Sequence, residues 1–183
     1  MHFYPVPSYS LPLGTLIPKD IENLIIAEKS ISVSNLVNGT TRLQPVVLQI
    51  GQAAGALAAL AVKENKKPSL VSVRHAQTEI LKANGYIMPY LDLPLTDKHF
   101  KALQHIGATG ILRGEGKNVG WSNQTWFNAD SLVLSKEIQN GIKEYCGITI
   151  GHTNNTLNIK ESLSIINCLA GYFKLKKVSA KHY

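Results

Sequence analysis

The longest apolar stretch of the chain lies at residues 46–63 (VVLQIGQAAGALAALAVK), and its spacing predicts a helix. Pro45 stands where a proline is tolerated in a first helical turn, and Asn65 and Pro68 follow as stop signals. The N-terminus of such a helix presents free N–H groups and a partial positive charge, which suit an electron-rich ligand. Small residues recur at offsets of three and four and would let another backbone come close. These residues are Gly51, Ala54, Gly55 and Ala58.

The segments before this helix alternate between breakers and short apolar runs. The prolines up to Pro18 predict extended chain with turns. The run NLIIA at residues 23–27 predicts a buried strand, and residues 30–37 predict a second strand or a loop. Asn38 and Gly39 then form a turn signal.

A further helix is predicted at residues 73–84, with Ser72 as its N-cap and Gly85 in the position of a C-terminal glycine cap. The composition of the chain changes after this helix. Residues 86–94 are rich in proline and large apolar side chains, and we interpret them as a linker between two units.

Three amphipathic helices are predicted in the second half, at residues 97–109, 131–145 and 158–173. A glycine-rich loop at residues 110–130 separates the first two. The segments that lead into the last two helices resemble each other, which indicates a weak internal repeat. The pattern therefore predicts an α-rich α+β chain: a short β element with two helices in residues 1–88, then a three-helix unit with a basic tail in residues 89–183.

Composition narrows the classes of partner. The 183 residues carry a formal charge of +7 and a sequence pI near 9.4, but the basic residues are dispersed, and neither a basic stripe with aromatics nor a nucleic-acid motif is present. The first ten residues lack the pattern of a signal peptide. The helix at residues 46–63 is almost long enough to span a bilayer, but Gln49 and Gln52 interrupt it, so we expect no membrane span and no nucleic-acid partner.

Metal and hydrolytic chemistry find little support. No two of the six histidines have the spacing of a zinc pair, so no metal site is expected. No nucleophile elbow, P-loop or G-x-G-x-x-G fingerprint occurs, and the catalytic residues, if this chain has any, are unknown. Cys146 and Cys168 allow one bridge or two free thiols.

Two places could contact a ligand. The turn at residues 38–42 before the long helix could hold an anion or the N1–C2=O edge of a reduced flavin ring, although many ordinary helices also follow a Gly-Thr turn. Trp121 and Trp126 in the glycine-rich loop could stack on a glycan or a partner domain, or could simply pin the loop to the helices.

Several motifs in residues 9–63 resemble, in order, the C-terminal portion of the FAD-dependent oxidoreductase family. They are the tyrosine-containing segment ending in LIPK (residues 9–19), NLIIAEKSIS (23–32), GTTR (39–42) and GQAAGALAA (51–59). This family has a glutathione-reductase-like nucleotide-binding domain at its N-terminus. Some bacterial members of this branch carry the label xanthan lyase, which no residue here supports.

The resemblance implies a cofactor site at the start of the long helix. The turn and the first helical residues would meet the flavin ring: Thr41, Arg42, Leu43, Gln44, Pro45 and Val46. It also implies that Gly51 and Gly55 pack this helix against the nucleotide-binding domain, so that FAD would be bound in a full-length protein and not by this chain alone. One position departs from the family: Glu28 stands where Ala-Gly-Arg has a glycine that allows close approach to the cofactor.

Residues 90–173 are similar to an S-layer homology domain, a small helical module often used for attachment to cell-surface glycans. The matching residues are Asp92, the HFxALQ segment at 99–104, Gly110-Ile111 with Gly114, and Trp126-Phe127 with Asp130. This resemblance implies a periplasmic or extracellular location.

Three functions remain open on the sequence. The first is the C-terminal part of an FAD-dependent oxidoreductase, inactive alone, whose partner is the nucleotide-binding domain of the same polypeptide. The second is a module that binds a carbohydrate or a protein partner. The third, part of a polysaccharide lyase, needs a base and a charge neutraliser that no spacing in this chain brings together.

Overall fold

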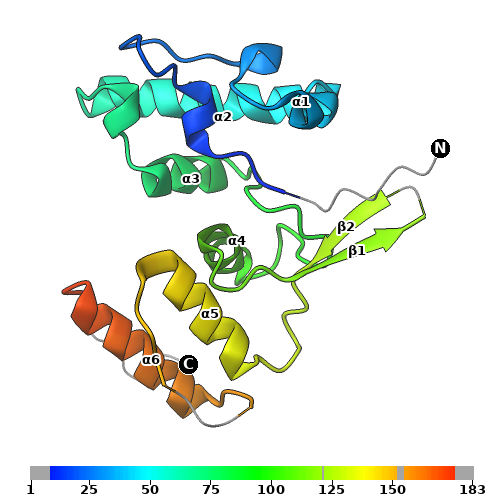
Figure 1. The fold of residues 1–183 in the computed structure, drawn as a ribbon, viewed down its shortest axis with the longest axis vertical. Coiled ribbons are helices and arrows are strands. Elements are labelled where there is room, and N and C mark those ends of the chain that lie inside the picture. The colour runs from blue at the N-terminus through cyan, green and yellow to red at the C-terminus, as the bar shows by residue number, and fades with distance from the viewer. Residues whose placement is uncertain (1–8, 121, 152–154, 176–183) are drawn as a thin grey trace.

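The computed structural model describes residues 9–120, 122–151 and 155–175 of the chain. Six α-helices, three 3-10 helices and one two-stranded antiparallel sheet make up this part of the chain (Figure 1). In chain order they are η1 (Leu13–Leu16), η2 (Glu28–Ser30), α1 (Asn35–Thr41), α2 (Gln44–Lys63), η3 (Pro68–Leu70), α3 (Val73–Lys82), α4 (Phe100–Thr109), β1 (Glu115–Val119), β2 (Ser122–Trp126), α5 (Ser135–Cys146) and α6 (Ile159–Tyr172). The α-rich α+β class predicted from the sequence is confirmed.

The N-terminal region, from η1 to α3, is built around α2. One buried cluster joins α2 to the start of α3, and a second joins the first half of α2 to the preceding loops. The first cluster comprises Leu57, Leu60, Ala61, Val71 and Ala76, and the second comprises Leu16, Ile31, Ile50 and Ala54. In Figure 1, α3 lies on one side of α2, so the buried side chains of α2 face α3 and the loops.

The strand predicted at residues 23–27 is wrong. Of the two alternatives for residues 30–37, the strand is wrong, while residues 31–34 form a loop before α1. Residues 24–27 form neither helix nor strand, and Asn23 and Glu28 at their two ends adopt positive φ angles of 59° and 58°. The segment makes single main-chain bonds to the η1 region, from Ile26 N to Leu16 O and from Ser32 N to Thr15 O. Because η1 is a 3-10 helix, it cannot offer a ladder of partners, and no sheet forms there.

The helix α1 occupies positions where the sequence predicts the end of a strand or loop and then a turn at Asn38-Gly39. Ser34 caps α1, since its side chain accepts a hydrogen bond from Val37 N. In the sequence this N-cap signal competes with an alternation of polar and apolar residues that suits a strand or a loop. Gly39 therefore lies inside a helix and not in a turn.

The long helix α2 and its neighbour α3 agree with the prediction within two residues at each end. The cap of α3 differs in detail. Ser72 occupies the N-cap position without a side-chain bond, and Asn84, with φ 58°, adopts the left-handed conformation that had been assigned to Gly85. Gly85 is needed for another reason: a Cβ there would lie 2.7 Å from Ile80 Cγ2.

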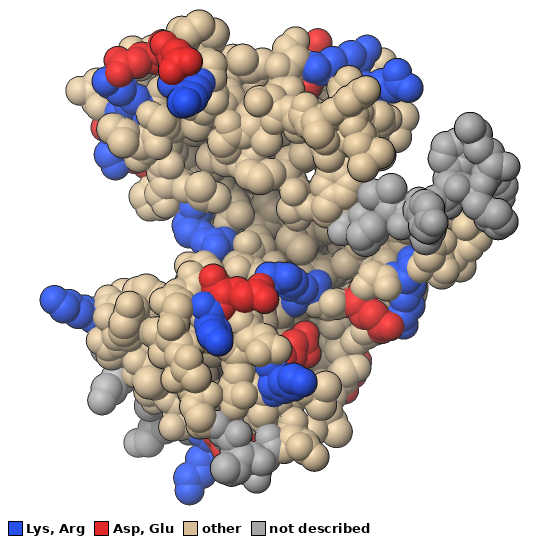
Figure 2. Space-filling model, in the orientation of Figure 1, with Lys and Arg blue, Asp and Glu red and all other residues tan. Residues whose placement is uncertain are grey.

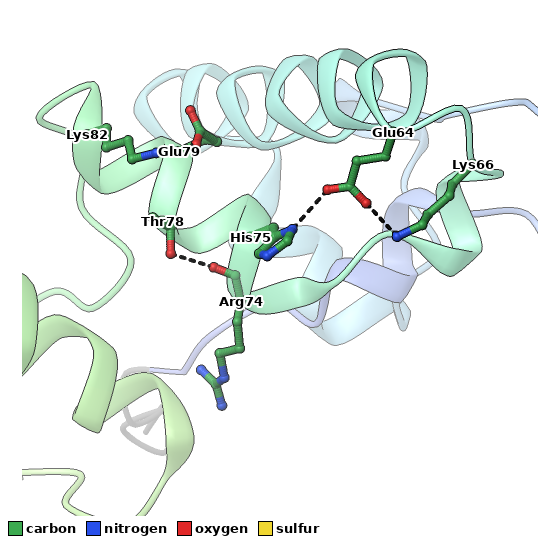
Figure 3. Close-up of polar contacts among 7 residues, drawn as sticks. All are labelled: Glu64, Lys66, Arg74, His75, Thr78, Glu79 and Lys82. Atoms are coloured by element: carbon green, nitrogen blue, oxygen red, sulfur yellow. Dashed lines mark hydrogen bonds and ion pairs between the residues drawn. The ribbon is translucent and has the colours of Figure 1, made fainter. Parts of the chain in front are cut away.

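A polar network ties the end of α2 to α3 (Figure 3). The Glu64 carboxylate accepts from Lys66 Nζ at 2.8 Å and contacts His75 Nδ1 at 2.8 Å. These contacts, that with Lys66 first and that with His75 second, lower the pKa of Glu64 below its ordinary value.

The C-terminal region, from α4 to α6, shares core residues with α3. Leu81 of α3 packs in one buried cluster with Tyr90, Leu93 and Phe100. The segment interpreted as a linker therefore contributes buried side chains to this cluster. Burial, and secondarily the nearby Asp92 carboxylate, raise the pKa of Tyr90 to about 12.

Two polar side chains hold this region together. Gln104 is fully buried, and its amide accepts from Ile87 N and Met88 N and donates to Met88 O, at 2.7–3.0 Å. Asp92 accepts from Phe127 N at 2.8 Å and Asn128 N at 2.7 Å. Buried and half-buried main-chain groups are thereby paired, as close packing requires.

The two-stranded sheet of the described residues lies in the segment predicted as a glycine-rich loop. In the antiparallel pair of β1 and β2, Glu115 lies opposite Trp126 at one end and Val119 lies opposite Ser122 at the other. The hairpin projects from the body in Figure 1. The three helices predicted in this half exist as α4, α5 and α6 with shifted ends. The repeated lead-in segments pair with each other through the bridge between Leu134 and Thr156. Cys146 and Cys168 are free thiols.

Candidate functional site

The corner between α1 and α2 carries all six residues predicted to meet a cofactor. Thr41 ends α1, Arg42 is its C-cap, and Leu43 is the N-cap of α2. Gln44, Pro45 and Val46 form the first turn of α2. Only Arg42 and Leu43 lie between the two helices, since α1 ends at Thr41 and α2 begins at Gln44.

The start of α2 is an open helix end. Leu43 provides no side-chain cap, and the first turn contains no acidic residue. The first hydrogen bond of the helix runs from Val47 N to Leu43 O. The N–H groups of Gln44 and Val46 come before it and have no acceptor within the helix, and Pro45 has no N–H. Leu43, Gln44 and Pro45 are exposed. This end of a 20-residue helix therefore presents main-chain donors and the positive end of the helix dipole at the surface.

The side chain of Thr41 lies on the opposite, inner side of the corner. Its residue is 1% exposed, and its hydroxyl has no hydrogen-bond partner among the described residues. Asn38 Oδ1, one turn earlier on α1, is likewise buried and unpaired within the described part of the chain. In this conformation Thr41 can reach a ligand outside the corner only through its main chain.

A tyrosine from the start of the described chain closes the corner from one side. The Tyr9 hydroxyl contacts Thr40 Oγ1, and Thr40 Oγ1 donates to Val37 O at 2.8 Å. Since Thr40 uses its proton on Val37, Tyr9 is the donor to Thr40. Sequence reasoning did not place Tyr9 at this site, because the two residues are 31 positions apart.

Glu28 adopts a conformation that glycine would favour. Its φ of 58° is left-handed, and it lies in η2, which packs against α2. Ala27 before it contacts the cluster of Ile50 and Ala54. The exposed carboxylate of Glu28 therefore stands on the loop that covers the first half of α2.

The opposite face of α2 has no covering element among the described residues. We define the α2 outer face as Leu48, Gly51, Gly55, Ala58 and Val62, all exposed, at offsets of three and four. Leu48 is 73% and Val62 is 83% exposed, and a Cβ added at Gly51 or Gly55 would meet nothing within 4 Å. Of the small residues singled out in the sequence, Ala54 faces inward. By length and composition α2 could cross a membrane, although 28% of its apolar window is buried inside the protein.

The tryptophan site is partly visible. Trp121 lies outside the described residues, and Trp126 ends β2. The indole Nε1 of Trp126 donates to Gln124 Oε1 at 3.1 Å, and Lys117 Nζ lies 5.8 Å from the centre of the indole ring. These three side chains share one face of the hairpin, because their register positions alternate with those of the other face.

Metal chemistry is not indicated by the geometry. In the described ranges, no three His, Cys, Asp or Glu side chains gather in a way that could hold a metal ion.

Comparison with known families assigns a likeness to the first part of the chain. Residues 1–80 match the model of the family described as FAD dependent oxidoreductase. This range includes the α1–α2 corner and the whole of α2, and it supports the resemblance drawn from the sequence motifs. No curated protein and no solved structure matches the chain.

Proposed function

We propose that this chain is the C-terminal part of an FAD-dependent oxidoreductase, that it supplies one wall of the flavin pocket, and that it has no catalytic activity alone. The observation that carries the proposal is the coincidence of the family match at residues 1–80 with an uncapped, exposed start of α2 inside that range. A flavin, when bound, supplies an electron-accepting ring whose N1–C2=O edge becomes negative on reduction.

The residues at the α1–α2 corner suit the N1–C2=O edge of a reduced flavin ring. The N–H groups of Gln44 and Val46 can donate hydrogen bonds, and the helix dipole adds positive potential at the same place. Arg42, exposed beside them, adds a full positive charge. Leu43 and Pro45 would contribute apolar contact with the ring plane, while the Thr41 side chain supports the corner from inside.

The partner in this proposal is the family's nucleotide-binding domain, docked on the α2 outer face. Support comes from the exposure of Leu48 and Val62 and from the open space above Gly51 and Gly55. A helix that keeps such apolar side chains in water loses the stabilisation that burial would provide. A domain that covers the α2 outer face would restore this stabilisation.

Glu28 affects how well the assembled protein retains flavin. Its carboxylate replaces a glycine on the loop that packs against α2, and it adds a negative charge near a cofactor that carries a negatively charged pyrophosphate. We therefore expect weaker flavin retention in the assembled protein than in an otherwise identical Glu28→Gly variant.

The docking proposal is tested by mixing the chain with a separately produced nucleotide-binding domain from a protein that matches the same family model. We expect a complex that retains FAD through gel filtration. Gly55→Leu should abolish the complex because it fills the open space of the outer face. Gln49→Leu is the matched control, since Gln49 is exposed on α2 but outside that face. Equal complex formation by both variants would reject the docking surface.

A second candidate function is binding of a glycan by the β1–β2 hairpin. The joint presentation of Trp126, Gln124 and Lys117 on one face favours it, because an indole plane with neighbouring amide and ammonium donors suits a sugar ring. The likeness of this region to S-layer homology domains gives the same expectation. No observation favours a polysaccharide lyase, and we do not propose one.

Tryptophan fluorescence titrated with neutral and acidic glycans tests the second candidate. Binding should shift the emission in the parent chain and be lost in Trp126→Ala. Asn118→Ala is the control, because Asn118 lies on the other face of the hairpin. An unchanged response in Trp126→Ala would count against this site.

A further inference from the structure

Arg74 occupies an unusual position between the two regions of the molecule. It lies in the first turn of α3 and is half-buried. In Figure 3 its side chain points away from the Glu64–Lys66 network and toward the ribbon of the C-terminal region. Figure 2 shows that the surface is hollowed between these regions, with basic atoms at the hollow. Since Arg74 lies on α3 and the Tyr145 ring, 5.7 Å from its Cζ, lies on α5, the guanidinium reaches between the two regions.

The guanidinium of Arg74 has no acidic partner. Among the described residues, no carboxylate oxygen lies within 4.0 Å of it, and its side chain makes one hydrogen bond, from Nη1 to the neutral Gln77 Oε1 at 2.6 Å. Arg113 shows the contrast, because it pairs with Glu144 across the surface of the C-terminal region. A half-buried cation without a counter-ion is costly unless an anion completes it.

Neighbours from two other helices fix the surroundings of Arg74. Its Cζ lies 5.7 Å from the centre of the Tyr145 ring on α5, a distance at which the ring attracts the cation and restrains its plane. His105 on α4 is close enough that the Arg74 charge, after burial, helps to lower the pKa of its imidazole. A neutral imidazole can donate one hydrogen bond without adding a second positive charge.

We propose that this cleft, formed by Arg74, His105 and Tyr145, binds the carboxylate group of a small ligand. The guanidinium has a planar pair of donors that matches the two oxygens of a carboxylate, and Gln77 and Tyr145 hold that plane in place. A single positive charge with a neutral imidazole balances a monoanion, whereas a phosphate dianion would leave one charge uncompensated. The site is independent of the flavin proposal, because it involves α3, α4 and α5 and none of the residues of the α1–α2 corner.

The imidazole of His105 reports on this site. Sodium acetate should raise the pKa of His105 in the parent chain, because a bound carboxylate offsets the charge of Arg74. The NMR resonances of His105 report this pKa as acetate is added. Arg74→Gln should raise the His105 pKa without acetate and weaken the acetate response by roughly tenfold or more, since the charge-assisted pair is lost. Arg74→Lys should restore part of the response, because it keeps the charge and loses the planar pair of donors.

Arg113→Gln is the matched control, since it removes an arginine that already has a carboxylate partner. It should leave the acetate response of His105 unchanged. The proposal would be overturned if the acetate response survives in Arg74→Gln. It would also be overturned if the parent chain shows no acetate response although Arg74→Gln raises the His105 pKa. Replacing acetate by inorganic phosphate should give a weaker response, and a stronger one would reject the assignment to carboxylates.

Discussion

Two glycines of α2 and two glycines of the C-terminal region differ in what surrounds them. In the N-terminal region, a Cβ at Gly51 or Gly55 of α2 would meet nothing within 4 Å. In the C-terminal region, a Cβ at Gly107 would lie 2.0 Å from the Tyr90 hydroxyl oxygen, and one at Gly141 would lie 2.3 Å from Ile111 O. The second pair is already used for close packing within the chain, whereas the first pair leaves space for something else.

The polar groups around α4 and those at the α1–α2 corner differ in how many hydrogen bonds they make. Gln104 is buried in the C-terminal region with its amide in three hydrogen bonds, and Asp92 accepts from two main-chain N–H groups there. In the N-terminal region, the hydroxyl of Thr41 is buried without a described partner, and the first turn of α2 has no cap. The main-chain groups that Gln104 and Asp92 hold are therefore paired within the chain, although Thr125 Oγ1 and Ser135 Oγ of the same region, like Thr41 Oγ1, are buried without a partner among the described residues. The proposal that the α1–α2 corner and the α2 outer face form half of an interface rests on the uncapped helix start and the exposed apolar face.

The largest change in stability should follow from removing the buried amide of Gln104. Gln104→Met keeps the approximate volume but leaves Ile87 N, Met88 N and Met88 O unpaired in a buried place. We expect a loss of about 3 kcal/mol or more in the free energy of unfolding, since each orphaned group costs about 1–3 kcal/mol. Urea denaturation measures it. A loss below about 1 kcal/mol would mean that these groups find other partners.

The glycine contrast is sharpened by making the same change in both regions. Gly107→Ala should destabilise the chain by about 1–3 kcal/mol, because the added methyl group collides with Tyr90. Gly55→Ala should stabilise it by about 0.5–1 kcal/mol, because alanine favours the helix and meets open space. Thermal unfolding followed by circular dichroism compares the two. Effects of the same sign would contradict the proposed difference.

Glu28 allows a smaller test within the N-terminal region. Glu28→Gly should relieve the left-handed strain at φ 58° and stabilise the chain by about 0.5 kcal/mol, the net of relieved strain and added unfolded-state entropy. Lys29→Gly is the control, because Lys29 is a neighbour without a positive φ, and it should destabilise. A destabilised Glu28→Gly chain would show that the carboxylate itself contributes to folding.

The smallest effect concerns the Glu64 network. Because the folded pKa of Glu64 is lowered, its contribution to stability is present above the ordinary value of 4.5 and is lost as the pH falls through the folded pKa. Stability curves of the parent chain and Glu64→Gln should therefore converge below pH 4.5. Lys66→Gln should reduce the difference more than His75→Gln, since Lys66 is the larger cause of the shift. Parallel curves across this pH range would exclude such a role.

The sequence was most informative where one face of a helix is buried. The spacing of Ile50, Ala54, Leu57 and Ala61 defines α2 without any tertiary knowledge, and the breakers Asn65 and Pro68 end it. The strands failed for a physical reason. The apolar run NLIIA has strand composition, but its neighbour in space is a 3-10 helix, and no local pattern reports that.

At the candidate site, the sequence located the α1–α2 corner but not the directions of its side chains. Gly-Thr-Thr-Arg before Gln44-Pro45 marks the start of the helix. Whether Thr41 points inward depends on the position of α1, for which the sequence predicts a strand or loop and a turn. The contact between Tyr9 and Thr40 and the position of Arg74 in the cleft depend on long-range packing and left no signal in the spacing.

The central claim is that the N-terminal region is half of a flavin pocket whose other half belongs to a nucleotide-binding domain. The most direct measurement is to incubate the chain with excess FAD, remove free cofactor by gel filtration, and record the flavin absorbance of the protein fraction. The account predicts that the chain elutes without flavin. Stoichiometric retention of FAD by the chain alone would contradict it, because the α1–α2 corner would then be a complete site.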